Sequence, residues 1–312
     1  RGGLAMATIL SCGAFSAVCG SSLATTATMA RVAIPSMIQY GYQPGFSAGV
    51  VAAGGTLGIL IPPSIALIIY GILTETNIGH LFVAGVVPGA LGVLGYLSTV
   101  MVVTGRRAAP AGLDEKYTAR DKLLAVRSFG PVILLLVFII LGIYLGAFTA
   151  TEAAGMGAGF ALLLALARRQ LGWSVFVDVL YQSARTSALM LFLLIGAVLF
   201  SHFLETANFS KELGAFVLGL GASTAVVVAV VLVVYIVLGC FLESLSMILL
   251  TVPIFYPIMK DLNVDPVWFG ILVVVVTEIA LITPPIGMNI FVLRSVMPEI
   301  PIKAVYRGVI PF

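Results

Sequence analysis

The sequence repeats part of itself at a spacing of 222 residues. Residues 20–67 align with residues 242–289 without a gap, and four prolines recur at this spacing. The matched pairs are Pro35 with Pro257, Pro44 with Pro266, Pro62 with Pro284, and Pro63 with Pro285. An ungapped match that preserves four prolines, two of them adjacent, predicts two copies of one structural unit.

The two copies lie in a chain that is too apolar to be a soluble domain. Charged residues make up 9% and hydrophobic residues 61% of the 312 residues. A soluble domain carries about 25% charged residues. Much of the surface must therefore face lipid, and we expect an all-α polytopic membrane protein. The net charge of +3 comes from Lys and Arg in a few short loops, which is not the pattern of a nucleic-acid-binding protein. The three cysteines lie in apolar segments and suggest neither a zinc site nor a disulfide.

Apolar stretches of about 20 residues predict the membrane spans. They cover residues 46–73, 80–104, 129–148, 150–167, 186–204 and 267–295. The basic residues 105–127 form a loop that the positive-inside rule places in the cytoplasm, and residues 173–185 form an amphipathic helix at the interface. The chain thus crosses the membrane five times between the copies, so the second copy is inverted relative to the first. Inverted repeats with interrupted hydrophobic segments are typical of secondary transporters with a site near the midplane.

Each copy contains two interruptions of its apolar segments. The first, at residues 20–22 and 242–246, predicts a re-entrant hairpin with a polar tip. The second, at residues 54–64 and 277–289, contains the Pro-Pro pair. Proline removes a backbone donor and pushes the preceding residue out of the α conformation, so these breaks free carbonyl groups. Free carbonyls in lipid cost several kcal/mol each unless something fills them, and Na⁺ suits that role. The N-termini of the half-helices suit a carboxylate.

The breaks predict two related Na⁺ sites, one in each copy, with many ligands supplied by backbone carbonyls. The candidates in the first copy are Ser21, Ser22, Thr25, Gly54, Thr56 and Gly58. The candidates in the second copy are Ser244, Ser246, Thr277, Ala280, Thr283, Gly287 and Met288. The alternative for any one of these residues is that it only allows close helix packing.

Three charged residues lie within the apolar segments and are candidates for a substrate or charge role. Glu243 stands at the second hairpin tip and Glu278 precedes the second Pro-Pro pair. Either side chain is suited to coordinate a cation, carry a proton or hold a helix end. Arg31 is suited to pair with a substrate carboxylate or to extend to the membrane interface.

The residues of the first copy resemble those of a known family. The segments Gly20–Thr25, Ala33–Pro35, Gly54–Ser64 and Thr283–Gly287 are similar to the large membrane subunit of TRAP (tripartite ATP-independent periplasmic) transporters. The resemblance implies an elevator-type, Na⁺-driven importer of organic acids such as sialic acid or C4-dicarboxylates in the bacterial inner membrane. It implies two partners, a small four-helix membrane subunit and a periplasmic substrate-binding protein, and no organic cofactor. The family's large subunit begins earlier, so we expect an N-terminal part to precede Arg1.

The same resemblance assigns roles to four regions of the chain. Residues 1–78 hold the first hairpin and broken helix, and residues 213–297 hold the second pair. Both belong to the moving transport domain. Residues 79–212 are connecting and scaffold helices, and residues 298–312 are a C-terminal tail.

Other function classes fit the sequence less well. An intramembrane enzyme needs a nucleophile and a base within reach of each other, and neither histidine has a suitable neighbour at helical spacing. A channel would not need the repeat. A stand-alone Na⁺/carboxylate symporter or antiporter of similar architecture stays open as the alternative.

Overall fold

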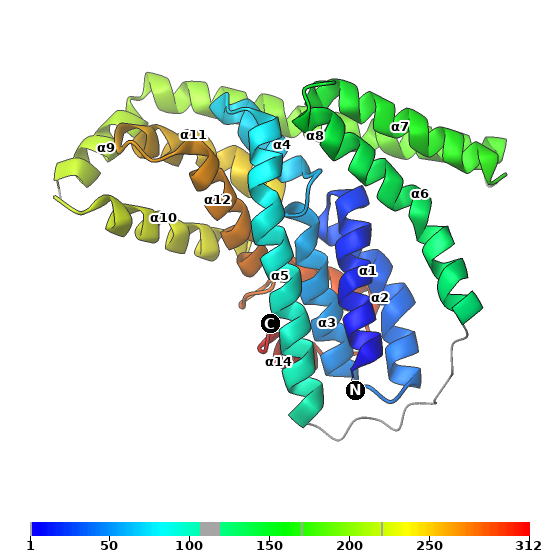
Figure 1. Cartoon of the computed structure of the whole chain (residues 1–312). Helices are drawn as coiled ribbons and strands as arrows, with labels where there is room; N and C mark the ends of the chain where they lie inside the picture. Colours follow the sequence, from blue (N-terminus) through cyan, green and yellow to red (C-terminus); the bar gives the residue numbers. More distant parts are fainter. Residues whose placement is uncertain (1, 107–118, 170, 220) are drawn as a thin grey trace. The chain divides into compact units, whose positions relative to one another are not determined.

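Every regular element is helical in the residues that the computed structural model describes, which are 2–106, 119–169, 171–219 and 221–312 (Figure 1). The chain divides into two units. The first combines Arg1–Glu115 with Gly214–Phe312, and the second is Lys116–Leu213.

The first unit contains both copies of the repeat. Its helices before the second unit are α1 (Gly3–Cys19), α2 (Ser22–Gln39), α3 (Pro44–Thr56), the 3₁₀ turn η1 (Leu57–Ile59), α4 (Ile65–Thr74) and α5 (Ile78–Arg106). Its later helices are α10 (Thr224–Gly239), α11 (Ser244–Asp261), α12 (Pro266–Leu281), α13 (Met288–Val296) and α14 (Ile302–Val309). The second unit contains α6 (Ala119–Tyr144), α7 (Ala150–Ala167) and α8 (Trp173–Thr206), and α9 (Phe209–Gly219) crosses the boundary.

Helix bounds in the first unit recur at the spacing found in the sequence. The first residues of α2 and α11 are 222 residues apart, as are their last residues, the first residues of α3 and α12, and the last residues of α4 and α13. Packing recurs as well, because α1 packs on α3 as α10 packs on α12, and α13 packs on α2 as α4 packs on α11. All four predicted interruptions coincide with helix ends. The orientation of the copies in a bilayer stays a prediction.

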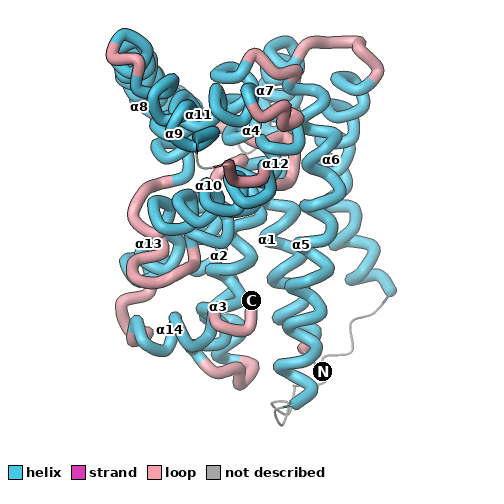
Figure 2. The backbone as a smooth tube through the Cα atoms, turned by 90° about the vertical axis from the view of Figure 1, so that its left-hand side faces the viewer, coloured by secondary structure: helices cyan, strands magenta, loops and turns pink. Residues whose placement is uncertain are grey.

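Local capping explains where the hairpins turn (Figure 2). Gly20 ends α1 in the left-handed region with φ 63°, and the Ser21 side chain caps α2 by accepting a hydrogen bond from the Ala24 N–H at 3.4 Å. The equivalent residue in the second copy, Glu243, caps α11 by accepting from the N–H groups of Leu245 and Ser246 at 2.9 and 3.2 Å. Acceptor side chains at both tips satisfy backbone donors that a helix start leaves unpaired.

Three helices among the described residues are long and apolar enough to cross a membrane. They are Ile78–Gly105, Ala150–Ala167 and Trp173–Thr206. The helices of the repeats are shorter, with α3 and α4 separated by one break and α12 and α13 by the other. This composition is that of a helical membrane protein.

Two predicted boundaries were wrong. We expected an interfacial helix at 173–185 and a separate span at 186–204, but α8 is one continuous helix. The sequence contains neither Gly nor Pro between Gly172 and Gly196, so nothing interrupts the helix where its polarity changes. The predicted loop 105–127 is also too long, because α5 continues to Arg106 and α6 begins at Ala119. The rest of that loop, 107–118, lies outside the described residues.

The second unit is held together by an α6–α7 hairpin. Leu135 and Ile139 of α6 are buried against Ala153 of α7. Thr149 and Glu152 form a reciprocal capping box that starts α7. Exchange of hydrogen bonds between these two residues fixes the entry of the chain into α7.

Glycines bring α3 and α14 of the first unit into backbone contact. A Cβ at Gly308 would overlap the carbonyl oxygen of Gly45, and a Cβ at Gly45 would lie 2.6 Å from the carbonyl oxygen of Ala304. Buried side chains of α2, α3, α13 and α14 surround this contact in one hydrophobic cluster. The contact therefore tolerates no side chain at position 308.

We expect the Gly308→Ala variant to lose about 1–3 kcal/mol of stability, because the added methyl group forces α14 away from α3. The measurement is the thermal unfolding midpoint in detergent. Gly95→Ala is the matched control, since a Cβ at Gly95 of α5 meets no atom within 4 Å. Equal midpoints for the two variants would contradict the assigned contact.

Candidate functional site

The tip of the first hairpin packs against the first helix break. A Cβ at Gly58 would lie 3.0 Å from both the carbonyl carbon of Ser21 and the nitrogen of Ser22. A Cβ at Gly20 would lie 3.6 Å from the carbonyl oxygen of Pro63. The structure thus brings the candidates Ser21, Ser22 and Gly58 together.

Several oxygen atoms at this first tip lack hydrogen-bond donors. Ser22 Oγ is buried and has no partner. Among the described residues, no donor reaches the carbonyl oxygens of residues 60–63. Thr25 lies one turn along α2, where its hydroxyl accepts a hydrogen bond from Ser16 Oγ at 3.3 Å. Ser16, on α1, is a site-lining residue that the sequence analysis missed.

The other two candidates of the first copy make packing contacts elsewhere. Thr56 Oγ1 donates to the carbonyl oxygen of Ala53 at 2.8 Å and lies 3.0 Å from the Tyr96 hydroxyl of α5. Gly54 packs against Cys12 of α1, whose Cβ would lie 2.9 Å from a Cβ at position 54. These two residues fix α3 against its neighbours.

The second hairpin tip meets the second break in the same way. The Gly287 N–H donates to the carbonyl oxygen of Cys240 at 3.2 Å, and the Cys240 thiol donates to the carbonyl oxygen of Pro284 at 3.4 Å. A Cβ at Gly239 would lie 2.6 Å from the Cβ of Ala280. The candidates Ala280 and Gly287 therefore lie at the contact between the tip and the break.

Backbone carbonyls gather around Gly287. Its φ is +62°, and a Cβ there would lie 3.1 Å from the carbonyl oxygen of Leu281 and 3.2 Å from that of Thr283. No described residue donates to the carbonyls of residues 281–283. By contrast, Tyr306 of α14 donates to the carbonyl oxygens of Pro285 and Ile286, at 2.7 and 2.8 Å. Tyr306 was not foreseen, and it satisfies part of what the Pro-Pro pair frees.

The hydroxyl groups of the second copy are used within their own helices. Thr277 donates to the Val273 carbonyl at 2.7 Å and Thr283 donates to the Ile279 carbonyl at 2.6 Å. Ser244 Oγ donates to Glu243 at 2.9 Å. A hydroxyl that donates keeps lone pairs for a cation. Ser246 and Met288 are partly buried near the tip and the break.

Two buried polar side chains flank the second break. Glu278 of α12 is 6% exposed and its Oε1 has no partner. Asn289 of α13 is fully buried, donates from Nδ2 to the Ala52 carbonyl of α3 at 3.2 Å, and leaves Oδ1 without a partner. Asn289 thus joins the two copies. Sequence reasoning missed it, although a polar residue just after the Pro-Pro break is a usable signal.

The remaining charged candidates differ in their surroundings. The Glu243 carboxylate is engaged by the start of α11, so its visible role is to hold that helix end. Arg31 is exposed on α2 and forms no ion pair with any described residue. Both readings of Arg31 made from the sequence stay predictions.

Oxygen atoms dominate both tips, and this donor set suits a hard cation such as Na⁺. The described residues contain no cluster of three or more His, Cys, Asp or Glu side chains of the kind that holds a transition metal. The geometry therefore fits the expected ion, with the first site formed by Ser21, Ser22 and Gly58 and the second by carbonyls around Gly287.

Comparison with known proteins gives the family. The model of the tripartite ATP-independent periplasmic transporter, DctM component, matches residues 1–312. The C4-dicarboxylate TRAP transporter large permease protein DctM of Pseudomonas aeruginosa is 41% identical, over 100% of this chain and 73% of its own length. The sialic acid TRAP transporter large permease protein SiaM of Vibrio cholerae is 31% identical over 95% and 69%. The isethionate TRAP transporter permease protein DctMQ of Oleidesulfovibrio alaskensis is 34% identical over 95% and 46%. These names are those of transporter permeases and not of enzymes. The chain belongs to the DctM component family of tripartite ATP-independent periplasmic transporters.

Proposed function

We propose that this chain imports a small organic acid across the bacterial inner membrane, driven by Na⁺. The observation that carries the proposal is the pairing of each hairpin tip with a broken helix whose carbonyls lack donors. In a membrane such carbonyls need a cation or another partner. Their occurrence at equivalent positions of two repeats supports two coupling sites.

The repeat supports an alternating-access mechanism. The two hairpins and the two broken helices are proposed to move together as a transport domain, in the manner of an elevator, with the copies inverted across the midplane. Contacts between the copies, such as Asn289 with the Ala52 carbonyl, favour their movement as one body. Related repeats exchange inward and outward roles in this class of carrier.

Charge balance links the number of ions to the substrate. Two Na⁺ with a monoanion carry one net positive charge inward, which gains about 2.3 kcal/mol per 100 mV of inside-negative potential. Two Na⁺ with a dianion are electroneutral and gain only from the Na⁺ gradient. The substrate proposed first is a C4-dicarboxylate, because the relative with 41% identity carries that name. Sialic acid is the next candidate.

Two partners complete the proposal. A small four-helix membrane subunit and a periplasmic binding protein fit the word tripartite in the family description. A relative named DctMQ supports the first of them. The alternative is a stand-alone carrier that needs no binding protein.

Uptake by the full-length protein with its membrane partner in liposomes tests the proposal. Labelled C4-dicarboxylate is offered with and without an inward Na⁺ gradient, and with and without the cognate binding protein. Uptake that requires both supports the proposal. Uptake that requires Na⁺ alone favours the stand-alone carrier, and Na⁺-independent uptake contradicts Na⁺ coupling.

We expect Ser22→Ala to weaken the apparent Na⁺ affinity of uptake by about fivefold, because one neutral oxygen ligand is worth about 1 kcal/mol. The measurement is the Na⁺ concentration at half-maximal uptake. Thr28→Val is the matched control, since Thr28 is exposed on the same helix. An unchanged Na⁺ dependence in Ser22→Ala would remove this hydroxyl from the site.

A further inference from the structure

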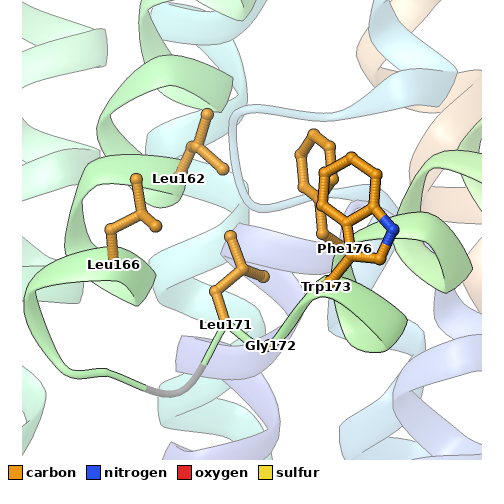
Figure 3. Close-up of a pocket in the computed structure, with 6 residues that line it drawn as sticks. All are labelled: Leu162, Leu166, Leu171, Gly172, Trp173 and Phe176. Atoms are coloured by element: carbon orange, nitrogen blue, oxygen red, sulfur yellow. The ribbon is translucent and has the colours of Figure 1, made fainter.

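The bend between α7 and α8 contains an apolar cavity that the proposed transport site does not use. Its volume is about 300 Å³, and it is lined by Leu162, Leu166, Leu171, Gly172, Trp173 and Phe176. Figure 3 shows the leucines of α7 on one side and the rings of Trp173 and Phe176 on the other. The volume is at the lower end of the range for small-molecule sites, about 300–1,000 Å³.

Positive charge lies at one end of the cavity. Arg168 and Arg169 are exposed and follow directly on the last residue of α7. They stand in the chain between two of the lining leucines, and residues 165–177 contain no acidic side chain. The nearest acidic residue beyond this stretch is Asp178, which is exposed on α8. The bend therefore combines an apolar hollow with two cationic side chains.

The length of α7 places this combination at a particular depth. Its 18 residues span about 27 Å at 1.5 Å per residue, close to the hydrocarbon thickness of about 30 Å. The arginines at its end therefore lie at headgroup level. Leu162 lies about 9 Å from Arg168 along the helix axis, at the level of the upper acyl chains. Trp173 is 79% exposed, and exposed tryptophans favour the interface.

We propose that this cavity binds an acyl chain of an anionic phospholipid, whose phosphate is held by Arg168 and Arg169. A phospholipid joins a negative headgroup to an apolar chain at the spacing that the bend presents. A zwitterionic lipid offers the same chain with less attraction for the two arginines. The proposal rests on membrane insertion but not on Na⁺ coupling, so either one can fail without the other.

Quenching of Trp173 fluorescence by brominated lipids tests the site. The full-length protein, with every other tryptophan replaced by phenylalanine, is placed in phosphatidylcholine nanodiscs. Phosphatidylglycerol or phosphatidylcholine brominated in the acyl chain is then titrated in. We expect half-maximal quenching at about a tenfold lower mole fraction of the brominated phosphatidylglycerol.

Variants separate charge from shape. The double variant Arg168→Gln with Arg169→Gln is expected to lose the preference, and Arg168→Lys with Arg169→Lys to keep most of it. Leu162→Phe fills the cavity and should reduce quenching by both lipids. Leu163→Phe is its control, because Leu163 is 66% exposed on the same helix and does not line the cavity. A reporter that retains only Trp268, in the first unit, should respond to none of these changes.

Three results would overturn the proposal. Equal quenching by the two lipids would show that the arginines do not select an anionic headgroup. A preference that survives both glutamine substitutions would place the anionic lipid elsewhere. Protection of Trp173 from both lipids would mean that protein covers the cavity.

Discussion

The Gly287→Ala variant is expected to reduce Na⁺-dependent uptake by about 5- to 100-fold while the protein still inserts and folds. Gly287 has a φ of +62°, and a side chain in such a conformation costs about 1–3 kcal/mol. Its Cβ would also stand 3.1–3.2 Å from the Leu281 and Thr283 carbonyl oxygens, in the space proposed for the second Na⁺. The measurement is initial uptake rate against Na⁺ concentration in proteoliposomes.

A matched glycine separates strain from crowding. Gly146, in the α6–α7 turn, has a φ of +70°, but a Cβ there would meet no atom within 4 Å. Gly146→Ala therefore introduces the conformational cost without blocking carbonyls, and its Na⁺ dependence should stay as in the parent. If both alanine variants lose uptake equally, backbone strain is the cause and the carbonyls around Gly287 are not a cation site.

Replacing Glu278 by glutamine is expected to lower the apparent Na⁺ affinity by about 10- to 100-fold. The side chain is 6% exposed and one of its oxygens is unpaired. A buried carboxylate without a partner is costly, so a membrane protein retains one where a cation neutralises it. Loss of an interaction with a charged group is worth about 1.5–3 kcal/mol. Glutamine preserves the shape and removes the charge.

The control for Glu278→Gln comes from the other copy. Thr56 occupies the equivalent position, 222 residues earlier, and its hydroxyl bonds to Tyr96 and to the Ala53 carbonyl. Thr56→Val removes polar contacts but no charge, so it should alter thermal stability more than Na⁺ affinity. A Glu278→Gln variant with parental Na⁺ dependence and a changed melting temperature would assign Glu278 a structural role only.

Helix bounds in the repeats were predictable because each is marked by a residue with a local effect. Pro44 and Pro266 stand at the first positions of α3 and α12, where a missing N–H costs nothing. Ser21 and Glu243 mark the starts of α2 and α11. The end expected near residue 185 was wrong, because a change from polar to apolar sequence without Gly or Pro does not stop a helix.

The sequence indicated which hairpin tip belongs with which break, but not every side chain that meets there. Ser22 and Gly58 were found because both copies are interrupted at matched places. Tyr306 and Asn289 were missed, since their contacts join elements that only packing brings together. Asn289 reaches a carbonyl 237 residues away in the chain, a distance that no local pattern encodes.

The Tyr306 hydroxyl lies within hydrogen-bonding distance of two carbonyl oxygens but carries a single hydrogen. At any instant it can direct that hydrogen at only one of them, so the second break always keeps one oxygen in reserve. A small rotation of the hydroxyl exchanges the two without moving the backbone. The break thereby has two nearly equivalent electrostatic settings, and an ion arriving at its inner face would select between them at little cost.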